Sequence, residues 1–262
     1  MKKCTFANVT NVVETLPQKQ TKPKRSMENA NEPRKQDVVK EIANMWEPLT
    51  GEQKAELSRN IVIRHYKTGE LIYNDHGTPT HMMYIISGKA KIYKDGVGSG
   101  SRRQILRIVK AKEFFAFRAY FANETYKTNS IAFEPTVIAQ LPLKYVETLA
   151  SKSTSVAMFI LRHLAKILGG SDERIVNLTQ KHIRGRLAET LLMLTDEYGT
   201  ETDEGKLCLS LSREDLACFS NMTTSNAIRT LSAFASEGLI EIYRRNIKLL
   251  NKEELIEISR MG

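Results

Sequence analysis

The spacing of apolar residues changes once along this chain, near Pro142, and that change restricts the fold more than any other feature. Between residues 61 and 141, short runs such as Met82–Ile86 and Gln104–Val109 are separated by glycine-containing turns, of which Ser87–Lys89 is one. Strand-like runs with turns about every 8–12 residues are typical of an antiparallel sandwich or barrel. After Pro142 the apolar residues recur at helical spacing. The sequence therefore predicts an α+β chain with an N-terminal antiparallel, jelly-roll-like β-roll.

The helical spacing over residues 151–183 predicts one long helix. Apolar residues line one side of it from Val156 through Leu164 to Leu178. This stripe is too long for a small β-roll to cover, so we predict that the helix pairs with its copy in a homodimer. A Gly-Gly pair at 169–170 costs about 2 kcal/mol relative to two alanines. It indicates either a bend or close packing of the partner chain.

Residues 209–231 have the pattern of two short helices joined by a tight turn. Ser212 is a good N-cap for the first helix, with Asp215 three residues later to support its first turn. Ser220–Met222 is the predicted turn, and Thr223 is the predicted cap of the second helix. We expect the second helix to bury four apolar residues, Ala227, Ile228, Leu231 and Phe234.

The outer face of that second helix is polar near its start, where a recognition helix meets base edges in the major groove of double-stranded DNA. A strand pair over residues 239–250 follows, and its basic turn is a candidate wing against phosphate. The alternative is an ordinary helical hairpin with a solvated face. The predicted DNA-binding residues are Ser212, Arg213, Thr223, Thr224, Ser225, Asn226, Arg229, Arg244 and Arg245.

Charge and cysteine content restrict the partners and the compartment. The chain has 39 Lys and Arg against 30 Asp and Glu, a net charge of +9, which suits an anionic partner. Residues 184–262, however, carry 10 basic and 13 acidic groups, so they must bind DNA through local clusters. Three scattered cysteines give no disulfide framework, and no apolar run is long enough to span a membrane. We expect a cytoplasmic protein with no membrane partner.

These patterns divide the chain into four segments. Residues 1–36 are polar and aperiodic and predict a disordered arm, whose basic stretch 19–25 is either solvated tail or a phosphate contact. Met27 is a second candidate for the first residue, which leaves open whether residues 1–26 are translated. Residues 37–150 form the predicted β-roll, 151–183 the long helix, and 184–262 the winged helix-turn-helix.

Three stretches resemble the CRP/FNR superfamily of transcription regulators. Residues 172–192 look like the family's linker helix, while Lys67–Ile72 and Met83–Tyr93 resemble its effector domain. The resemblance covers about residues 38–250. It implies a β-roll of the cyclic-nucleotide-binding type, a long dimerisation helix and a winged helix-turn-helix. It also implies a homodimer that binds a two-fold-symmetric operator, with RNA polymerase as a further candidate partner.

The chain departs from the family members that bind cyclic AMP. Their cassette has a Glu that grips the ribose hydroxyl and an Arg that neutralises the cyclic phosphate; Phe117 and Lys127 stand at those positions. Phenylalanine cannot accept the ribose hydrogen bonds, and lysine lacks the bidentate fork of arginine. The adenine-contacting Thr-Ser pair is matched by Ser171-Asp172. We therefore expect no cofactor, no control by cyclic AMP through the usual cassette, and an unknown effector.

Other readings stay open at this point. The candidate effector pocket consists of Phe115, Phe117, Arg118, Lys127, Thr128, Ser171 and Asp172. Lys127 and Thr128 could hold another anion, or the aromatic residues could fill the pocket as core. The chain could be gated by another anionic or hydrophobic small molecule, or its winged helix could bind protein. A β-roll metalloenzyme is disfavoured because the five histidines include no His-x-His pair, although they leave a haem ligand open. We predict no metal site and no enzymatic activity.

Overall fold

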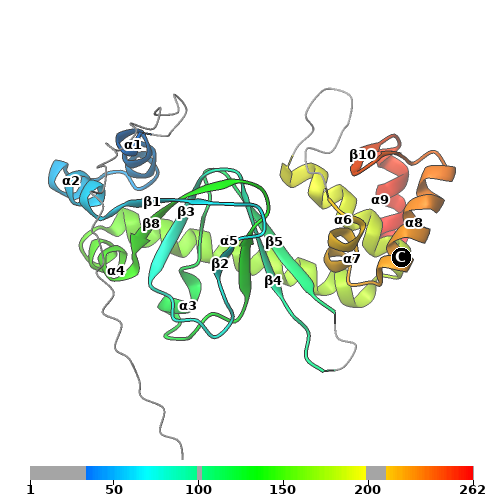
Figure 1. Cartoon of the computed structure of the whole chain (residues 1–262), viewed down its shortest axis with the longest axis horizontal. Helices are drawn as coiled ribbons and strands as arrows, with labels where there is room; N and C mark the ends of the chain where they lie inside the picture. Colours follow the sequence, from blue (N-terminus) through cyan, green and yellow to red (C-terminus); the bar gives the residue numbers. More distant parts are fainter. Residues whose placement is uncertain (1–33, 99–101, 199–210, 262) are drawn as a thin grey trace, which may run out of the picture. The chain divides into compact units, whose positions relative to one another are not determined.

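The computed structural model describes residues 34–98, 102–198 and 211–261 (Figure 1). The predicted disordered arm lies outside these ranges except for its last three residues, and Lys35 already begins a helix. In chain order the elements are α1 (Lys35–Met45), α2 (Gly51–Asn60), β1 (Val62–Tyr66), β2 (Leu71–Tyr73), β3 (His81–Ser87), β4 (Lys89–Lys94), β5 (Gln104–Lys110), β6 (Phe114–Phe115), α3 (Arg118–Phe121), β7 (Asn129–Ala132), β8 (Thr136–Pro142), α4 (Leu143–Lys152), α5 (Thr154–Gln180), α6 (Ile183–Tyr198), α7 (Arg213–Phe219), α8 (Thr224–Ser236), β9 (Ile240–Tyr243), β10 (Asn246–Leu249) and α9 (Lys252–Met261).

Two antiparallel four-stranded sheets form the β-roll that the sequence predicts. Their strand orders are β1-β8-β3-β6 and β2-β7-β4-β5. Because side chains alternate across a strand, neighbouring residues enter different cores. On β3, Met82 and Tyr84 pack with the helices α1, α2, α4 and α5, while Met83 and Ile85 pack in the interior of the roll.

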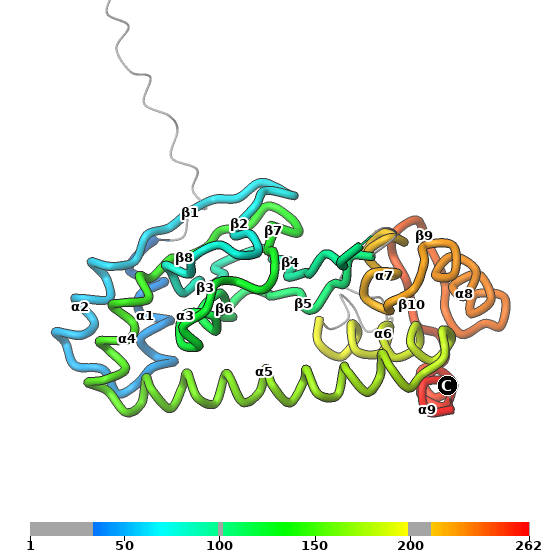
Figure 2. Tube along the Cα trace, turned by 90° about the horizontal axis from the view of Figure 1, so that it is seen from below, coloured from blue at the N-terminus to red at the C-terminus, as the bar shows by residue number. Residues whose placement is uncertain are grey.

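The helical run after Pro142 consists of two helices, α4 and α5, and the long helix predicted over residues 151–183 corresponds to α5. α4 ends at Lys152, and Ser153 is extended, with φ −133° and ψ 107°, before α5 begins at Thr154. α5 then continues through the glycine pair without a break (Figure 2). A Cβ atom on either Gly169 or Gly170 would meet nothing within 4 Å, so packing inside this chain does not require glycine there.

α5 buries one side and exposes another. Val156 and Ile160 pack in the helix-covered core, and Leu164 is half-buried against it. In contrast, Leu161, Leu168 and Ile175 are 58%, 63% and 61% exposed. Leu164, a member of the predicted dimerisation stripe, thus packs in part against the helix-covered core.

The C-terminal elements α6 to α9 surround a core of their own. Leu187 and Leu191 of α6, Leu216 of α7 and Phe234 of α8 are buried together there. α9 closes the core with Leu255 and is an addition to the predicted elements. Within the described ranges, no helix has the length and apolar character needed to cross a membrane.

One arginine joins the β-roll, the long helix and the C-terminal core. Arg174 of α5 donates hydrogen bonds to the carbonyl of Ile105 on β5 at 2.8 Å and to that of Phe219 at the end of α7 at 2.9 Å. Its guanidinium also lies over the Phe219 ring, 5.1 Å from the centroid. Gln104 donates to the same Phe219 carbonyl at 3.1 Å. These bonds satisfy a carbonyl that the end of α7 leaves free and fix that helix against the β4–β5 hairpin.

Candidate functional site

α7 and α8 form the predicted pair of capped helices. The backbone N–H of Asp215 donates to the Ser212 hydroxyl at 3.0 Å, and that hydroxyl donates to the Asp215 carboxylate at 2.7 Å. At the second helix, the N–H of Asn226 donates to the Thr223 hydroxyl at 3.2 Å. Asn221 in the turn between them has φ 49°, a left-handed conformation that asparagine tolerates. Both caps are therefore local: Ser212 fixes where α7 begins, and Thr223 fixes where α8 begins.

α8 has one buried apolar face and one exposed face. Ala227, Leu231 and Phe234 are buried at 0–1% exposure, and Asn226 is half-buried. The exposed residues are Thr224, Ser225, Ile228, Arg229, Ser232 and Ser236, and each lies three or four positions from another member of the set. We call this set the α8 stripe. Ile228 was expected to face inward, and that expectation is wrong: the side chain is 48% exposed.

The turn between β9 and β10 lies beside α7. Arg244 and Arg245 are both exposed in it, and Arg244 has φ 55°. Arg213, at the start of α7, donates from Nη2 to the Arg244 carbonyl at 3.2 Å, which ties the turn to the first helix. The Arg244 guanidinium lies 5.5 Å from the ring centroid of Tyr243. The nine predicted DNA-binding residues thus lie in three adjoining segments: the α7 start, the α8 start and this wing.

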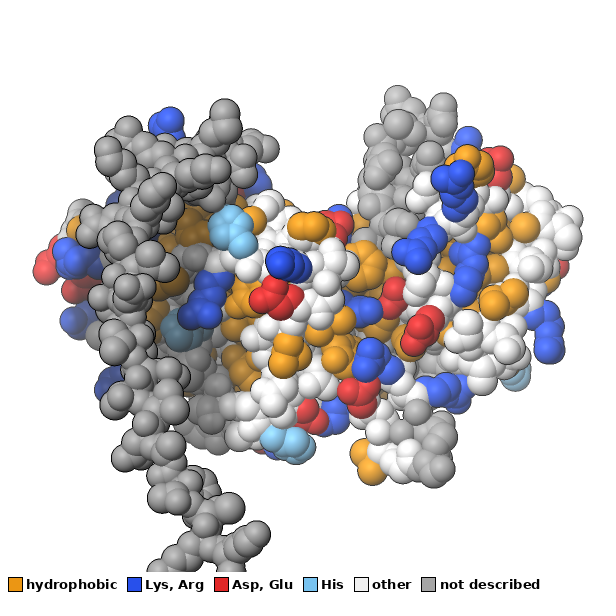
Figure 3. All heavy atoms as spheres, in the orientation of Figure 1, with side chains coloured by type: hydrophobic (Ala, Val, Ile, Leu, Met, Phe, Trp, Pro, Cys, Tyr) orange, Lys and Arg blue, Asp and Glu red, His pale blue; other side chains and the backbone are white. Residues whose placement is uncertain are grey.

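Two carboxylates of this domain, one on α7 and one just past the end of α8, are paired with cations. Lys91 of β4 contacts Asp215 at 2.7 Å, and both side chains are less than one-fifth exposed. Arg184 donates from both Nη atoms to Glu237, just past the α8 end, and this contact lowers the pKa of the Glu237 carboxyl. α8, all of which the structure describes, contains no Asp or Glu. The C-terminal segment is acidic in total, yet Lys and Arg are well represented on the face that Figure 3 shows.

The aromatic members of the predicted effector pocket are core residues. Phe115 is 2% exposed and lies in the interior of the roll, while Phe117 is 1% exposed and lies in the helix-covered core. The two therefore occupy different cores, two residues apart. Phe117 packs against His163 of α5, with ring centroids 5.5 Å apart. The space at this position is filled by the chain itself.

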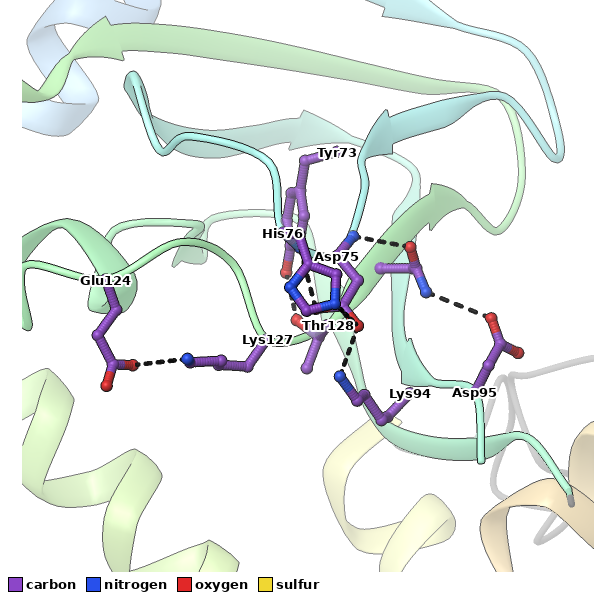
Figure 4. Close-up of polar contacts among 9 residues, drawn as sticks. Tyr73, Asp75, His76, Lys94, Asp95, Glu124, Lys127 and Thr128 are labelled. Carbon is purple, nitrogen blue, oxygen red and sulfur yellow. Dashed lines mark hydrogen bonds and ion pairs between the residues drawn. The ribbon is translucent and has the colours of Figure 1, made fainter. Parts of the chain in front are cut away.

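The polar members of that pocket do not converge on one point. Lys127 points toward Glu124, 3.9 Å away, and not toward the neighbouring Thr128 (Figure 4). Thr128 lies 3.3 Å from the hydroxyl of Tyr73. Arg118 is exposed on α3. Ser171 and Asp172 are exposed on α5, where the Ser171 hydroxyl donates to the Ile167 carbonyl at 2.8 Å.

Tyr73 and Tyr126 are the residues that sequence reasoning missed in the β-roll. Their rings stack with centroids 4.1 Å apart, and the Tyr126 hydroxyl donates to the carbonyl of Ala116 at 3.2 Å. Burial raises the pKa of Tyr73, with its hydrogen bond to Thr128 acting in the opposite direction. The two residues are more than fifty positions apart, and no local motif pairs them. Nearby, Asp75 is held by Lys94 at 2.5 Å (Figure 4).

Titratable side chains do not form a metal centre in the part of the chain that the structure covers. Among residues 34–98, 102–198 and 211–261, His, Cys, Asp and Glu do not gather in groups of three or more that could hold an ion.

Two family models match this chain, one for each half of the fold. Residues 63–153 match the cyclic nucleotide-binding domain, and residues 185–258 match the Crp-like helix-turn-helix domain. The chain belongs to the CRP/FNR family of transcription regulators. The helix-turn-helix of this family is a DNA-binding domain, and the family consists of regulators, not enzymes.

Known proteins agree with this membership. Electron transport regulator A of Shewanella oneidensis is 24% identical over 189 residues, which cover 71% of this chain and 74% of the relative. The cAMP-activated global transcriptional regulator CRP of Haemophilus influenzae is 20% identical, with 79% and 96% covered. The structure of FixK2 from Bradyrhizobium japonicum superimposes with a TM-score of 0.68 at 21% identity, over 76% of this chain and 97% of that one. This last likeness concerns the fold.

Proposed function

We propose that this CRP/FNR regulator is a homodimer that places α8 in the major groove at each half of a two-fold-symmetric operator. The observation that carries the proposal is the α8 stripe, which presents Arg229 among uncharged side chains on a helix free of carboxylates. A positively charged, hydrogen-bonding helix face suits base edges, and the basic wing beside it suits phosphate. The proposal includes a cytoplasmic location, where such a regulator would meet its DNA, and RNA polymerase as a second partner.

The exposed side of α5 supports the dimer. Met158, Leu161, Ala165, Leu168, Asp172, Ile175 and Thr179 follow at alternating spacings of three and four, the pattern of a two-stranded coiled coil. Three of the large apolar residues in this series are more than half exposed. A second copy of α5 would bury them, and the open glycine pair at 169–170 lets the partner helix approach closely.

The packed β-roll supports independence from cyclic AMP. A nucleotide would need acceptors for its ribose hydroxyl and cations for its phosphate. Phe117 offers no acceptor and is buried in the helix-covered core, and Lys127 is directed to Glu124 at the surface. We infer that DNA binding needs no cyclic AMP and no other resident cofactor.

The test begins with selection of duplexes that the full-length chain binds, followed by light scattering of the protein in solution. We expect a dimer that binds a palindromic duplex. Leu168→Asp places a carboxylate in the exposed apolar stripe and should give monomers that lose the operator. Lys166→Asp, an exposed position on another side of the same helix, is the matched control and should remain dimeric. A wild-type monomer, or selection of no duplex, would refute the proposal.

A further inference from the structure

The α8 stripe contains one large apolar side chain, Ile228. At about 100° per residue, position 228 lies a quarter-turn or more from the buried Ala227 and on the same side as Ser225 and Ser232. Ile228 is 48% exposed, while Ala227 and Leu231 are buried. The core of this domain therefore leaves much of the isoleucine uncovered.

The neighbours of Ile228 on the helix leave it accessible. Of the four residues at one helical turn on either side, Leu231 is buried, while Thr224, Ser225 and Ser232 are exposed and short. None of the three short side chains can cover an isoleucine, and Arg229, the next residue along the chain, lies about 100° further around the helix. Ile228 thus stands as an apolar projection between small polar side chains, next to the one cation of α8.

The major groove of DNA offers one apolar group on its base edges, the 5-methyl group of thymine. Guanine presents O6 and N7, which match the fork of an arginine. A helix that carries Arg and Ile at successive positions can therefore contact a guanine and a nearby thymine at once. The absence of a carboxylate from α8 removes the acceptor that would favour cytosine.

We propose that Ile228 is a specificity-determining residue that reads a thymine 5-methyl group close to the guanine contacted by Arg229. This inference rests on the proposed function, because it requires α8 to lie in the major groove. It assigns each half-site a thymine whose methyl group, and not its hydrogen-bonding edge, is recognised.

Replacing thymine by deoxyuridine tests this directly, because uracil keeps the base pair and lacks only the methyl group. Each thymine of one half-site in the selected operator is replaced singly, and binding is measured by fluorescence anisotropy. With the wild-type chain, one or two positions should lose about fourfold in affinity, equivalent to about 0.8 kcal/mol for one buried methyl group. Ile228→Ala should weaken binding to the thymine operator by a similar factor and show no difference between thymine and uracil at those positions.

Val62→Ala is the matched control, since Val62 is 49% exposed on β1, away from α8. It should keep the wild-type preference for thymine. If Ile228→Ala retains the full thymine preference, or if the wild-type chain has none, Ile228 does not read the methyl group, although DNA binding itself stands. If the wild-type chain binds no duplex at all, the proposed function fails and this inference fails with it.

Discussion

The start of α8 and the effector pocket of the β-roll were both predicted to be binding sites. The structure exposes the predicted side chains of the first together on one face and disperses those of the second. On α8, Thr224, Ser225 and Arg229 lie together on one exposed face. In the β-roll, Phe115 and Phe117 are buried in two different cores, and Lys127 is at the surface. The positions of the side chains in the first site are determined by the N-caps and the helical period, which involve only about a dozen neighbouring residues. The second depends on side chains that meet from distant strands, so matched positions do not guarantee a pocket.

The comparison predicts that the β-roll residues act on stability and the α8 residues on recognition. Phe117→Ala should show the largest effect, lowering the free energy of unfolding by about 3–5 kcal/mol, because it leaves a cavity in the helix-covered core. Urea denaturation followed by circular dichroism measures this loss. Lys127→Ala, at an exposed position, should change it by less than about 0.5 kcal/mol. Equal, small effects from both substitutions would argue that Phe117 lines an open pocket.

On α8 the expected effect lies in specificity. Arg229→Ala should remove about 1–3 kcal/mol of discrimination at one guanine of each half-site, because α8 has no other Arg or Lys to donate to both O6 and N7 of guanine. The slope of affinity against salt should change little. Competition among operators with single-base changes measures the discrimination. A uniform loss across all operators would mean that Arg229 contacts phosphate and that the helix face has been assigned wrongly.

The wing should act on every duplex alike. Replacing both Arg244 and Arg245 by alanine should reduce the salt slope by about 0.9 for each phosphate that the protein no longer neutralises, and leave the ranking of operators unchanged. Both side chains are exposed on the turn that Arg213 holds in place. Titrations of several duplexes at a series of salt concentrations give both quantities. A changed ranking would assign base contacts to the wing.

The smallest expected effect is on the pH dependence of stability, and it concerns His163 of α5, which packs on Phe117. Burial lowers the pKa of His163, and the charge of Arg107 acts in the same direction. As the pH falls, the imidazole of His163 is therefore protonated in the unfolded chain, near its usual pKa of 6.5, before it is protonated in the folded chain. The stability that the neutral ring contributes is complete above that pH and is lost as pH falls through the lower pKa of the folded state.

His163→Gln should accordingly reduce the loss of stability on acidification below that point, as followed by denaturant unfolding at a series of pH values. His65→Gln, at an exposed position on β1, is the control and should keep the wild-type profile. An identical profile for His163→Gln and the wild type would mean that the His163 ring is not held buried and neutral in the folded chain.

Local patterns in the sequence were enough for the caps, the turn and the order of elements. Ser212 and Thr223 cap α7 and α8 as expected, because an N-cap needs only neighbours within one turn. The burial of residues at the margin of a helical stripe was harder to predict. Ile228 was assigned to the wrong side, since the helical period alone cannot decide which margin a neighbouring element covers.

Packing between residues far apart in the chain could not be predicted from local sequence patterns. The stack of Tyr73 on Tyr126 depends on the pairing of β2 with β7. The break at Ser153 that separates α4 from α5 has no Gly or Pro that would indicate the end of a helix in the sequence. Arg174, which joins β5 to α7, lies within the linker-like stretch and has no signal that distinguishes it from a solvated arginine.

The most direct test of this account is the affinity of the wild-type chain for its selected operator, measured with and without cyclic AMP at millimolar concentration. The recognition face of α8 is already formed, and the position of the nucleotide cassette is filled by Phe117. We therefore predict the same dissociation constant under both conditions. A fall of about tenfold or more on addition of cyclic AMP, equivalent to about 1.4 kcal/mol, would contradict the account.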